Sequence, residues 1–264
     1  MRLGRTAGMI AALGAVWLAS QTAQAEEAGE RLRYRIAYGN VPLAEASVLL
    51  QERNGRYEVS GEGVTSGPLD WLFDWRGRAS TVGRLSGTVF QPELHAQHGT
   101  WRGEQRLAEV RYEADRPIVH NVVPPPDPEE TTQVPEESIP GTIDPFSAAL
   151  TALKQFAATG TCRGTLPIFD GRRRYDMLLE DAGQTVLQSD RPWDYSGHAY
   201  GCKLKSRRIG GFFRDPDVRL TEDGEDSERV VWLAELAPGV WRPVRIEIDA
   251  PLGKIVARAV LAAE

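Results

Sequence analysis

Three consecutive arginines follow an Asp-Gly pair in the second half of the chain. The segment reads Asp170-Gly171-Arg172-Arg173-Arg174-Tyr175-Asp176. Guanidinium groups form paired hydrogen bonds to anions, so Arg172 and Arg174 are candidate ligands for an anionic group. The alternative is a hairpin turn at Asp-Gly, followed by an Arg-rich strand whose side chains pair with the protein's own acids.

A group of aromatic residues forms a second candidate site. Trp71, Phe73, Trp75 and Trp101 could line a cavity for an apolar ligand, because aromatic rings supply a large contact area. Such residues also commonly fill a protein core, and both interpretations stay open. Trp71 and Trp75 are the candidate binding residues of this group.

Other motifs that could carry chemistry lack the required context. His95 and His98 are three residues apart in a strand-like segment, which places them on opposite faces and disfavours a zinc site. The glycine-rich Ser60–Gly63 segment precedes more strand-like sequence and not the helix start that binds phosphate. The sequence has neither a Gly-x-Ser-x-Gly motif nor recognisably paired carboxylates. We therefore predict no catalytic residue, metal or cofactor.

The first 25 residues have the layout of a secretory signal peptide. Arg2 and Arg5 precede an apolar stretch at residues 7–18, and Ala23-Gln24-Ala25 fits the small-residue rule for cleavage. We expect cleavage after Ala25 and export to the periplasm.

Cys162 and Cys202 are the only cysteines. In an exported protein, two cysteines most simply form one disulfide, and a redox pair is disfavoured because there is no Cys-x-x-Cys spacing. Closing a loop of this length would stabilise the fold by roughly 3–4 kcal/mol in the entropic model.

Composition limits the remaining classes of protein. The 264 residues are 41% hydrophobic, which is enough for a packed core and excludes wholesale disorder. The net charge of −6 argues against a nucleic-acid partner. Because the sequence contains no apolar run of about 18 residues, we expect no transmembrane segment.

Most of the chain has the period-2 alternation of half-buried strands. Leu32, Tyr34, Ile36 and Tyr38 alternate with polar residues, and Asn54-Gly55 is typical of a hairpin turn. Strands recur at intervals of about 8–12 residues, which indicates an antiparallel meander rather than βαβ units.

One helix is expected within this meander. Asp144 is suited to cap it, Pro145 to its first position and Gly160 to its end. A shorter helical turn is possible at residues 69–75, and the acidic, proline-rich segment 124–141 is expected to be an exposed linker. We predict a single, mainly β domain over residues 26–264: an antiparallel meander curled into an open barrel or β-spiral, with one amphipathic helix packed on it.

Several segments together resemble the exported family known as domain of unknown function 3108. In chain order they are Asp74-Trp75-Arg76-Gly77-Arg78 with Gly83, Gln91-Pro92-Glu93, the acidic proline-rich segment, Gly141-Thr142-Ile143-Asp144-Pro145-Phe146-Ser147-Ala148, Leu166 to Asp176, Gly201-Cys202 with Gly210-Gly211-Phe212, and Trp241-Arg242-Pro243. The resemblance implies a periplasmic β-rich protein without known catalytic residues. The plan is also similar to periplasmic envelope-integrity proteins, in which a sheet curls into a spiral and one disulfide is present.

These observations favour a non-enzymatic periplasmic protein that supports the cell envelope. Its expected partner is an envelope lipid, a glycan or another envelope protein. The alternatives are a hydrolase acting on a cell-wall or lipid substrate and a purely structural interaction protein. The sequence does not predict an oligomeric state.

Overall fold

The computed structural model describes residues 29–67, 75–101, 103–113, 116–189, 191–214, 229–250 and 253–261. Within these ranges thirteen strands form one sheet, accompanied by an α-helix and a short 3-10 helix. The helices are α1 (Pro145–Thr159) and η1 (Glu136–Ser138). The strands are β1 (Glu30–Tyr38), β2 (Val41–Arg53), β3 (Arg56–Thr65), β4 (Trp75–Ser86), β5 (Val89–Trp101), β6 (Glu104–Glu113), β7 (Arg116–Val123), β8 (Gly164–Phe169), β9 (Arg174–Leu187), β10 (Gly197–Gly210), β11 (Arg229–Ala237), β12 (Val240–Ala250) and β13 (Gly253–Ala259).

The sheet is an antiparallel meander whose two halves meet at the ends of the chain. Its order is β7-β6-β5-β4-β3-β2-β1-β13-β12-β11-β10-β9-β8, so β1 pairs with β13 in the middle while β7 and β8 form the edges. It curls into a nearly closed barrel with α1 packed on it, which confirms the predicted fold class. The expected helical turn at residues 69–75 lies outside the described residues except for Trp75, which begins β4.

Local sequence signals account for the individual elements. Asn54 and Gly55 both have positive φ, at 51° and 72°, as the predicted hairpin turn between β2 and β3 requires. Asp144 caps α1 by accepting hydrogen bonds from the backbone N–H groups of Phe146 and Ser147, at 2.9 and 3.3 Å. Gly160 ends the helix in the left-handed region, with φ of 71°. The predicted helix is therefore confirmed at both ends.

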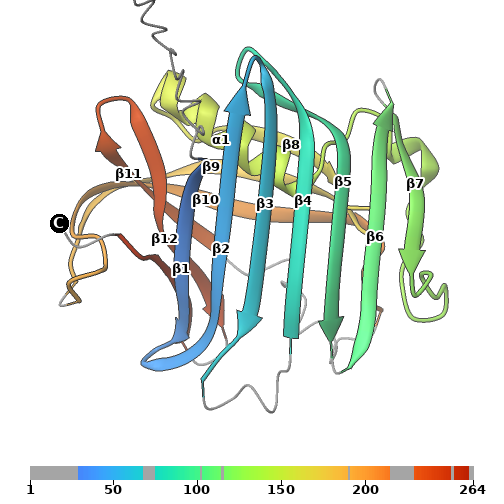
Figure 1. The fold of residues 1–264 in the computed structure, drawn as a ribbon, viewed down its shortest axis with the longest axis horizontal. Helices are drawn as coiled ribbons and strands as arrows, with labels where there is room; N and C mark the ends of the chain where they lie inside the picture. The colour runs from blue at the N-terminus through green and yellow to red at the C-terminus, as the bar shows by residue number, and fades with distance from the viewer. Residues whose placement is uncertain are drawn as a thin grey trace, which may run out of the picture.

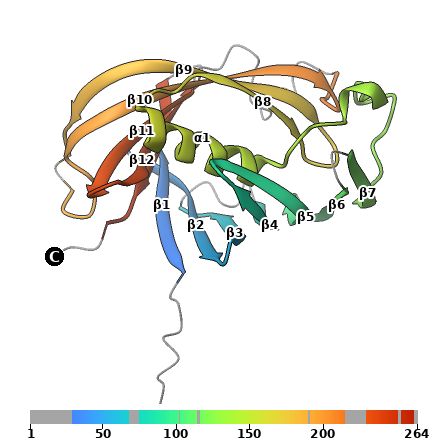
Figure 2. The same cartoon turned by 90° about the horizontal axis from the view of Figure 1, so that it is seen from above.

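The curl of the sheet encloses α1 between two walls. Strands β1–β7 form the near wall in Figure 1, and β8–β10 cross behind it. Seen from above, α1 lies between these walls (Figure 2). It packs against β4 and β5 on one side and against β8 and β12 on the other.

Side chains, and not strand pairing, close the barrel between its two edges. The turn between β8 and β9 packs closely against the inner face of β6. A Cβ added to Gly171 in this turn would lie only 2.7 Å from Val110 Cγ2. The Tyr112 hydroxyl donates to the carbonyl oxygen of Phe169 at 2.7 Å. Because these contacts replace a strand ladder, the geometry of this turn decides where the two walls meet.

The acidic segment 124–141 connects β7 to α1 and contacts the barrel on the way. Thr131 forms an isolated antiparallel bridge with Phe213, beyond the end of β10. Val134 and Ile139 pack against the buried cluster of Val110, Tyr112 and Phe169. The segment thus lies over the gap between the two edges of the sheet.

A disulfide between Cys162 and Cys202 ties the end of α1 to β10, with the two Cα atoms 5.5 Å apart. This confirms the pairing predicted for the two cysteines. Both residues are buried with Phe156 and Leu233. The ring of Phe156 packs edge-on against Trp241, with centroids 5.1 Å apart. The bridge therefore fixes the C-terminal half of α1 in an aromatic part of the core.

Replacing both Cys162 and Cys202 by Ser should lower the free energy of unfolding by roughly 3–4 kcal/mol, because the reduced unfolded chain regains the entropy of the closed loop. Urea unfolding measures the difference. A loss below about 1 kcal/mol would contradict a stabilising bridge, as would two reactive thiols in protein purified without reductant.

Candidate functional site

The inner face of β2–β5 carries a row of residues with almost no side chain. Ala46, Gly63, Gly77 and Gly99 stand directly opposite one another on these four strands. Directly opposed residues share one face of a sheet. This is the inner face, because Gly61, two residues before Gly63, faces α1: a Cβ added there would lie 2.7 Å from the ring of Phe146.

The indole ring of Trp75 lies over this row. A Cβ added to Gly77 would lie 2.7 Å from the ring, and one added to Gly63 would lie 2.9 Å from it. The glycines therefore make room for the indole against the backbone of the wall. Trp75 is nevertheless 38% exposed, so part of its ring remains available for contact.

A cavity of about 510 Å³ lies between this wall and the β8–β9 turn. Its volume falls within the roughly 300–1,000 Å³ typical of small-molecule sites. Aromatic, small and cationic residues line it together, and those used below are Phe146, Trp75, Gly77, Gln97, Arg106 and Arg172.

Positive charge gathers on one side of the cavity. The Arg172 guanidinium donates to the carbonyl oxygens of Leu107, at 3.1 Å, and Val123. Partial burial lowers the pKa of Arg172, and the positive charges of Arg106 and Arg173 lower it further, against the opposing effect of Asp170. The Nε atom of Arg106 is buried without a hydrogen-bond partner. Nearby cations that repel one another favour an anion between them.

Two of the four binding residues predicted from the sequence line this cavity, namely Trp75 and Arg172. Arg174 does not. It is 7% exposed and its guanidinium donates to the Ser138 carbonyl oxygen and to Asp176, at 2.7 and 2.6 Å, so it serves the protein's own structure. Trp71 lies outside the described residues.

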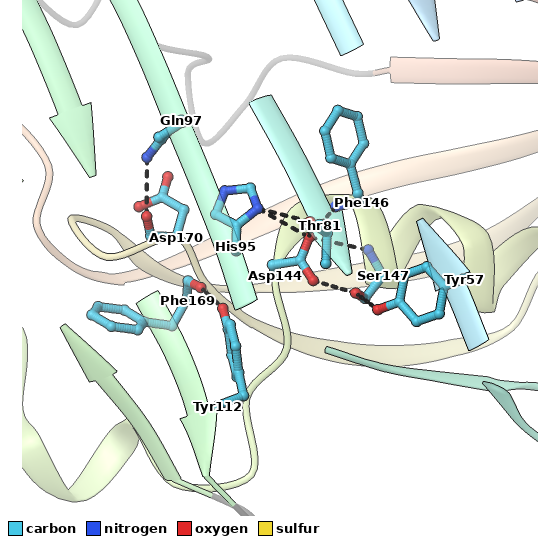
Figure 3. Close-up of polar contacts among 10 residues, drawn as sticks. All are labelled: Tyr57, Thr81, His95, Gln97, Tyr112, Asp144, Phe146, Ser147, Phe169 and Asp170. Carbon is cyan, nitrogen blue, oxygen red and sulfur yellow. Dashed lines mark hydrogen bonds and ion pairs between the residues drawn. The ribbon is translucent and has the colours of Figure 1, made fainter. Parts of the chain in front are cut away.

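The buried carboxylate of Asp170 stabilises the turn that carries Arg172. Asp170 accepts from the backbone N–H groups of Arg172 and Arg173, at 2.9 and 2.7 Å, and from Arg173 Nε at 3.0 Å. Burial alone would raise the pKa of Asp170, but the Arg173 charge and the two backbone donors outweigh it and lower the pKa. Gln97 Nε2 donates to the Asp170 carbonyl oxygen at 3.0 Å, which ties the turn to β5 (Figure 3).

A second buried polar network surrounds the start of α1 (Figure 3). The carboxylate of Asp144, with no exposed surface, accepts from Thr81 Oγ1 at 2.7 Å and from the Ser147 hydroxyl. His95 Nδ1 lies 2.9 Å from Thr81 Oγ1 and 3.4 Å from Asp144 Oδ1. Because the single hydroxyl proton of Thr81 goes to Asp144, His95 must carry its proton on Nδ1 and donate it.

This network contains Ser, His and Asp, but not in a catalytic order. The Ser147 hydroxyl donates directly to Asp144 and lies 2.6 Å from the Tyr57 hydroxyl, so no imidazole stands between the serine and the carboxylate. Each of these side chains is at most 3% exposed. The arrangement fixes the helix to β3, β4 and β5 and has no access for a substrate.

Sequence reasoning missed this network and the arginine beside the cavity. The sequence identifies Asp144 only as a helix cap, and neither Thr81 nor Arg106 belongs to a recognisable motif. Two sequence features could have indicated the network: the Asp-Pro pair at the start of a helix, and a histidine, His95, on the inward face of a strand. His98, by contrast, is exposed on the outer face, and the described residues include no cluster of three metal-ligating side chains.

A larger open cleft, of about 1860 Å³, borders the C-terminal half of α1. Large apolar side chains fill the barrel beside it, and the rings of Tyr57 and Phe90 pack edge-on with centroids 4.9 Å apart. Of these two hollows, the 510 Å³ cavity is the one bordered by the glycine and alanine row of β2–β5.

Comparison with known proteins agrees with this fold. The family model described as "Protein of unknown function (DUF3108)" matches residues 33–260. Among solved structures, the chain is similar to the crystal structure of a beta-barrel-like protein of domain of unknown function DUF1849 from Brucella abortus. The TM-score is 0.56 at 12% identity, over 88% of this chain and 95% of that one, which shows the fold alone. No curated protein matches the chain.

No helix in the described ranges has the length and apolar character to cross a membrane.

Replacing Asp144 by Ala should lower the free energy of unfolding by about 3 kcal/mol, because the helix loses its cap and buried hydroxyl donors lose their acceptor. Urea unfolding gives the value. Glu58→Ala, which removes an exposed carboxylate on β3, is the matched control and should change stability by less than about 0.5 kcal/mol. Similar losses in the two variants would contradict the role given to Asp144.

Acid should weaken the fold through the same carboxylate. Burial raises the pKa of Asp144, but hydrogen bonds from His95, Ser147 and Thr81 outweigh it, so the folded-state pKa lies below its ordinary value. The resulting stability is present above about pH 4 and is lost as pH falls through the folded-state pKa. In urea unfolding between neutral and acidic pH, the stability difference between wild type and Asp144→Asn should shrink below pH 4. A constant difference would refute this linkage.

Proposed function

The chain belongs to the DUF3108 family, whose function is unknown, and we propose that it is a non-enzymatic periplasmic protein that binds a lipid-like ligand with an acidic group in the 510 Å³ cavity. The observation that carries this proposal is the wall of glycine and alanine, which is covered by one partly exposed indole and bordered by arginines that include Arg106 and Arg172.

The wall supports an apolar ligand. Glycine within a strand weakens the sheet, and it often marks a place where a ligand or another chain segment approaches the backbone. Gly63, Gly77 and Gly99 are in register on three neighbouring strands, and the Trp75 indole occupies the space before the first two, so the ring itself forms part of the apolar wall. One side of Trp75 rests on Gly63 and Gly77, and its exposed part offers a flat apolar surface.

The arginines support an acidic group on that ligand. Arg106 and Arg172 lie close enough for their charges to interact, and both line the cavity. A carboxylate or phosphate between them would relieve their repulsion and supply an acceptor for the buried Arg106 Nε. A ligand with an apolar chain that contacts the wall and an acidic group that contacts the arginines would be an amphipathic lipid.

The residues of the cavity support binding over hydrolysis. Glycoside hydrolysis typically requires two carboxyl groups that face each other across the substrate. Among the described residues of this lining, Glu62 is the single carboxylate, and it belongs to the outward-facing positions of β3. The buried Ser147, His95 and Asp144 have no access to the cavity surface.

Two features support export to the periplasm. The first 25 residues have the charge, apolar stretch and cleavage pattern of a signal peptide. The disulfide between Cys162 and Cys202 suits an oxidising compartment. A lipid-binding role in that compartment would serve the cell envelope.

The proposal is tested with cis-parinaric acid, a fluorescent fatty acid, as the probe. The mature protein should bind it, and Trp75→Ala should weaken binding roughly 10–100-fold, the equivalent of one large apolar contact. Gly77→Ala should also weaken binding, because its new Cβ displaces the Trp75 ring. Arg172→Gln should weaken binding of the acid but not of its methyl ester.

Trp193→Ala is the matched control, because this tryptophan stacks on Arg35 at the outer face of β1. It should leave the affinity for the probe unchanged, and thermal melting should show that every variant remains folded. Failure of the wild type to bind either probe, or an unchanged affinity in Trp75→Ala, would overturn the cavity as the binding site.

A further inference from the structure

Five arginines lie near one another on the outer side of β1 and of β4, one of the strands of the cavity wall. Arg31, Arg33 and Arg35 occupy alternate positions of β1, and Arg76 and Arg78 occupy alternate positions of β4. All five are exposed. They point outward because they alternate with Tyr34 and Gly77, whose side of the sheet faces the interior. We call these five residues the outer arginine patch.

Strand register brings the two groups of arginines together. Arg33 and Arg78 belong to one row across β1–β4, and Arg35 and Arg76 belong to the next row. With neighbouring strands about 4.8 Å apart and alternate residues about 7 Å apart, the patch measures roughly 14 Å on each side. Only the tertiary pairing creates it, since the two groups are about forty residues apart in the chain.

The patch is positive although the chain as a whole is acidic. The net charge of the full sequence is −6. Two carboxylates lie between the arginines, Glu45 and Glu62, and they neutralise the patch only in part. Arg31 and Glu62 are 3.8 Å apart with both side chains at least half exposed, so this ion pair contributes little. A groove of about 1080 Å³ runs along the same residues.

An aromatic residue borders the patch. Trp193 is half-buried, and its ring centre lies 4.6 Å from Arg35 Cζ and 5.7 Å from Arg191 Cζ. Tryptophan beside basic residues is typical of surfaces that contact the headgroup region of a membrane, because the ring is apolar and its N–H remains hydrated.

We propose that the outer arginine patch docks the protein on a membrane surface that contains anionic phospholipid. The charges are spread over a sheet face instead of converging on one point, which matches an array of headgroup phosphates better than a single bound anion. Guanidinium groups suit this role because each can donate two parallel hydrogen bonds to a phosphate. The inference does not rest on ligand binding in the cavity, whose wall is the other face of these strands; of the five arginines, only Arg78 also borders that cavity.

Co-sedimentation with vesicles tests the docking surface. The mature protein should bind vesicles of phosphatidylglycerol and phosphatidylcholine in equal parts, and not vesicles of phosphatidylcholine alone. Binding should weaken as salt is raised, because exposed charges are screened. The triple variant Arg33→Gln/Arg76→Gln/Arg78→Gln should bind the anionic vesicles roughly a hundredfold more weakly.

A second triple variant removes the same charge elsewhere. Arg84→Gln/Arg116→Gln/Arg163→Gln changes three exposed arginines outside the patch and should keep most of the vesicle binding. Trp75→Ala should bind vesicles like wild type, which separates this surface from the cavity. The proposal is overturned if anionic vesicles are not bound, if both triple variants lose binding equally, or if the patch binds soluble heparin but no vesicle.

Discussion

The buried carboxylate of Asp144 determines where the only α-helix of the described chain lies inside the barrel. A charged group without exposed surface is costly unless hydrogen bonds satisfy it. Asp144 accepts two of these bonds from the first turn of its own helix and another from Thr81 on β4. Since the donors come from both elements, moving the helix away from β4 would leave a buried charge unsatisfied.

The position of α1 in turn decides which part of the barrel is filled. Phe146, the second helical residue, packs against Gly61 and forms one end of the small cavity. The later turns bring Phe156 against Tyr200 and Trp241, with ring centroids 5.7 and 5.1 Å apart, beside the disulfide. The C-terminal half of the helix therefore packs on one side against an aromatic cluster and borders the larger cleft on another, whereas the small cavity lies beside its N-terminus.

The same strands serve two surfaces because alternate residues of a strand point in opposite directions. In β4, Trp75 and Gly77 shape the cavity wall, while Arg76 and Arg78 face outward. One short segment therefore contributes both to the apolar binding surface and to the outer arginine patch. A one-residue shift of register would exchange these faces, so the strong pairing of β3, β4 and β5 protects both.

The sequence by itself determined the features that depend on neighbouring residues or on simple counting. The caps at Asp144 and Gly160, the Asn54-Gly55 turn and the alternation of strands are local, and two cysteines allow a single pairing. Tertiary structure alone decided that Arg172 faces a cavity. Arg174, two residues away, instead forms an ion pair with Asp176. The tertiary structure also brought Thr81, His95 and Asp144 together, and it placed Trp75 over glycines of its own and a neighbouring strand. These contacts depend on strand register and on the curl that joins the two edges of the sheet, and both arise from pairing between distant segments that no local pattern encodes.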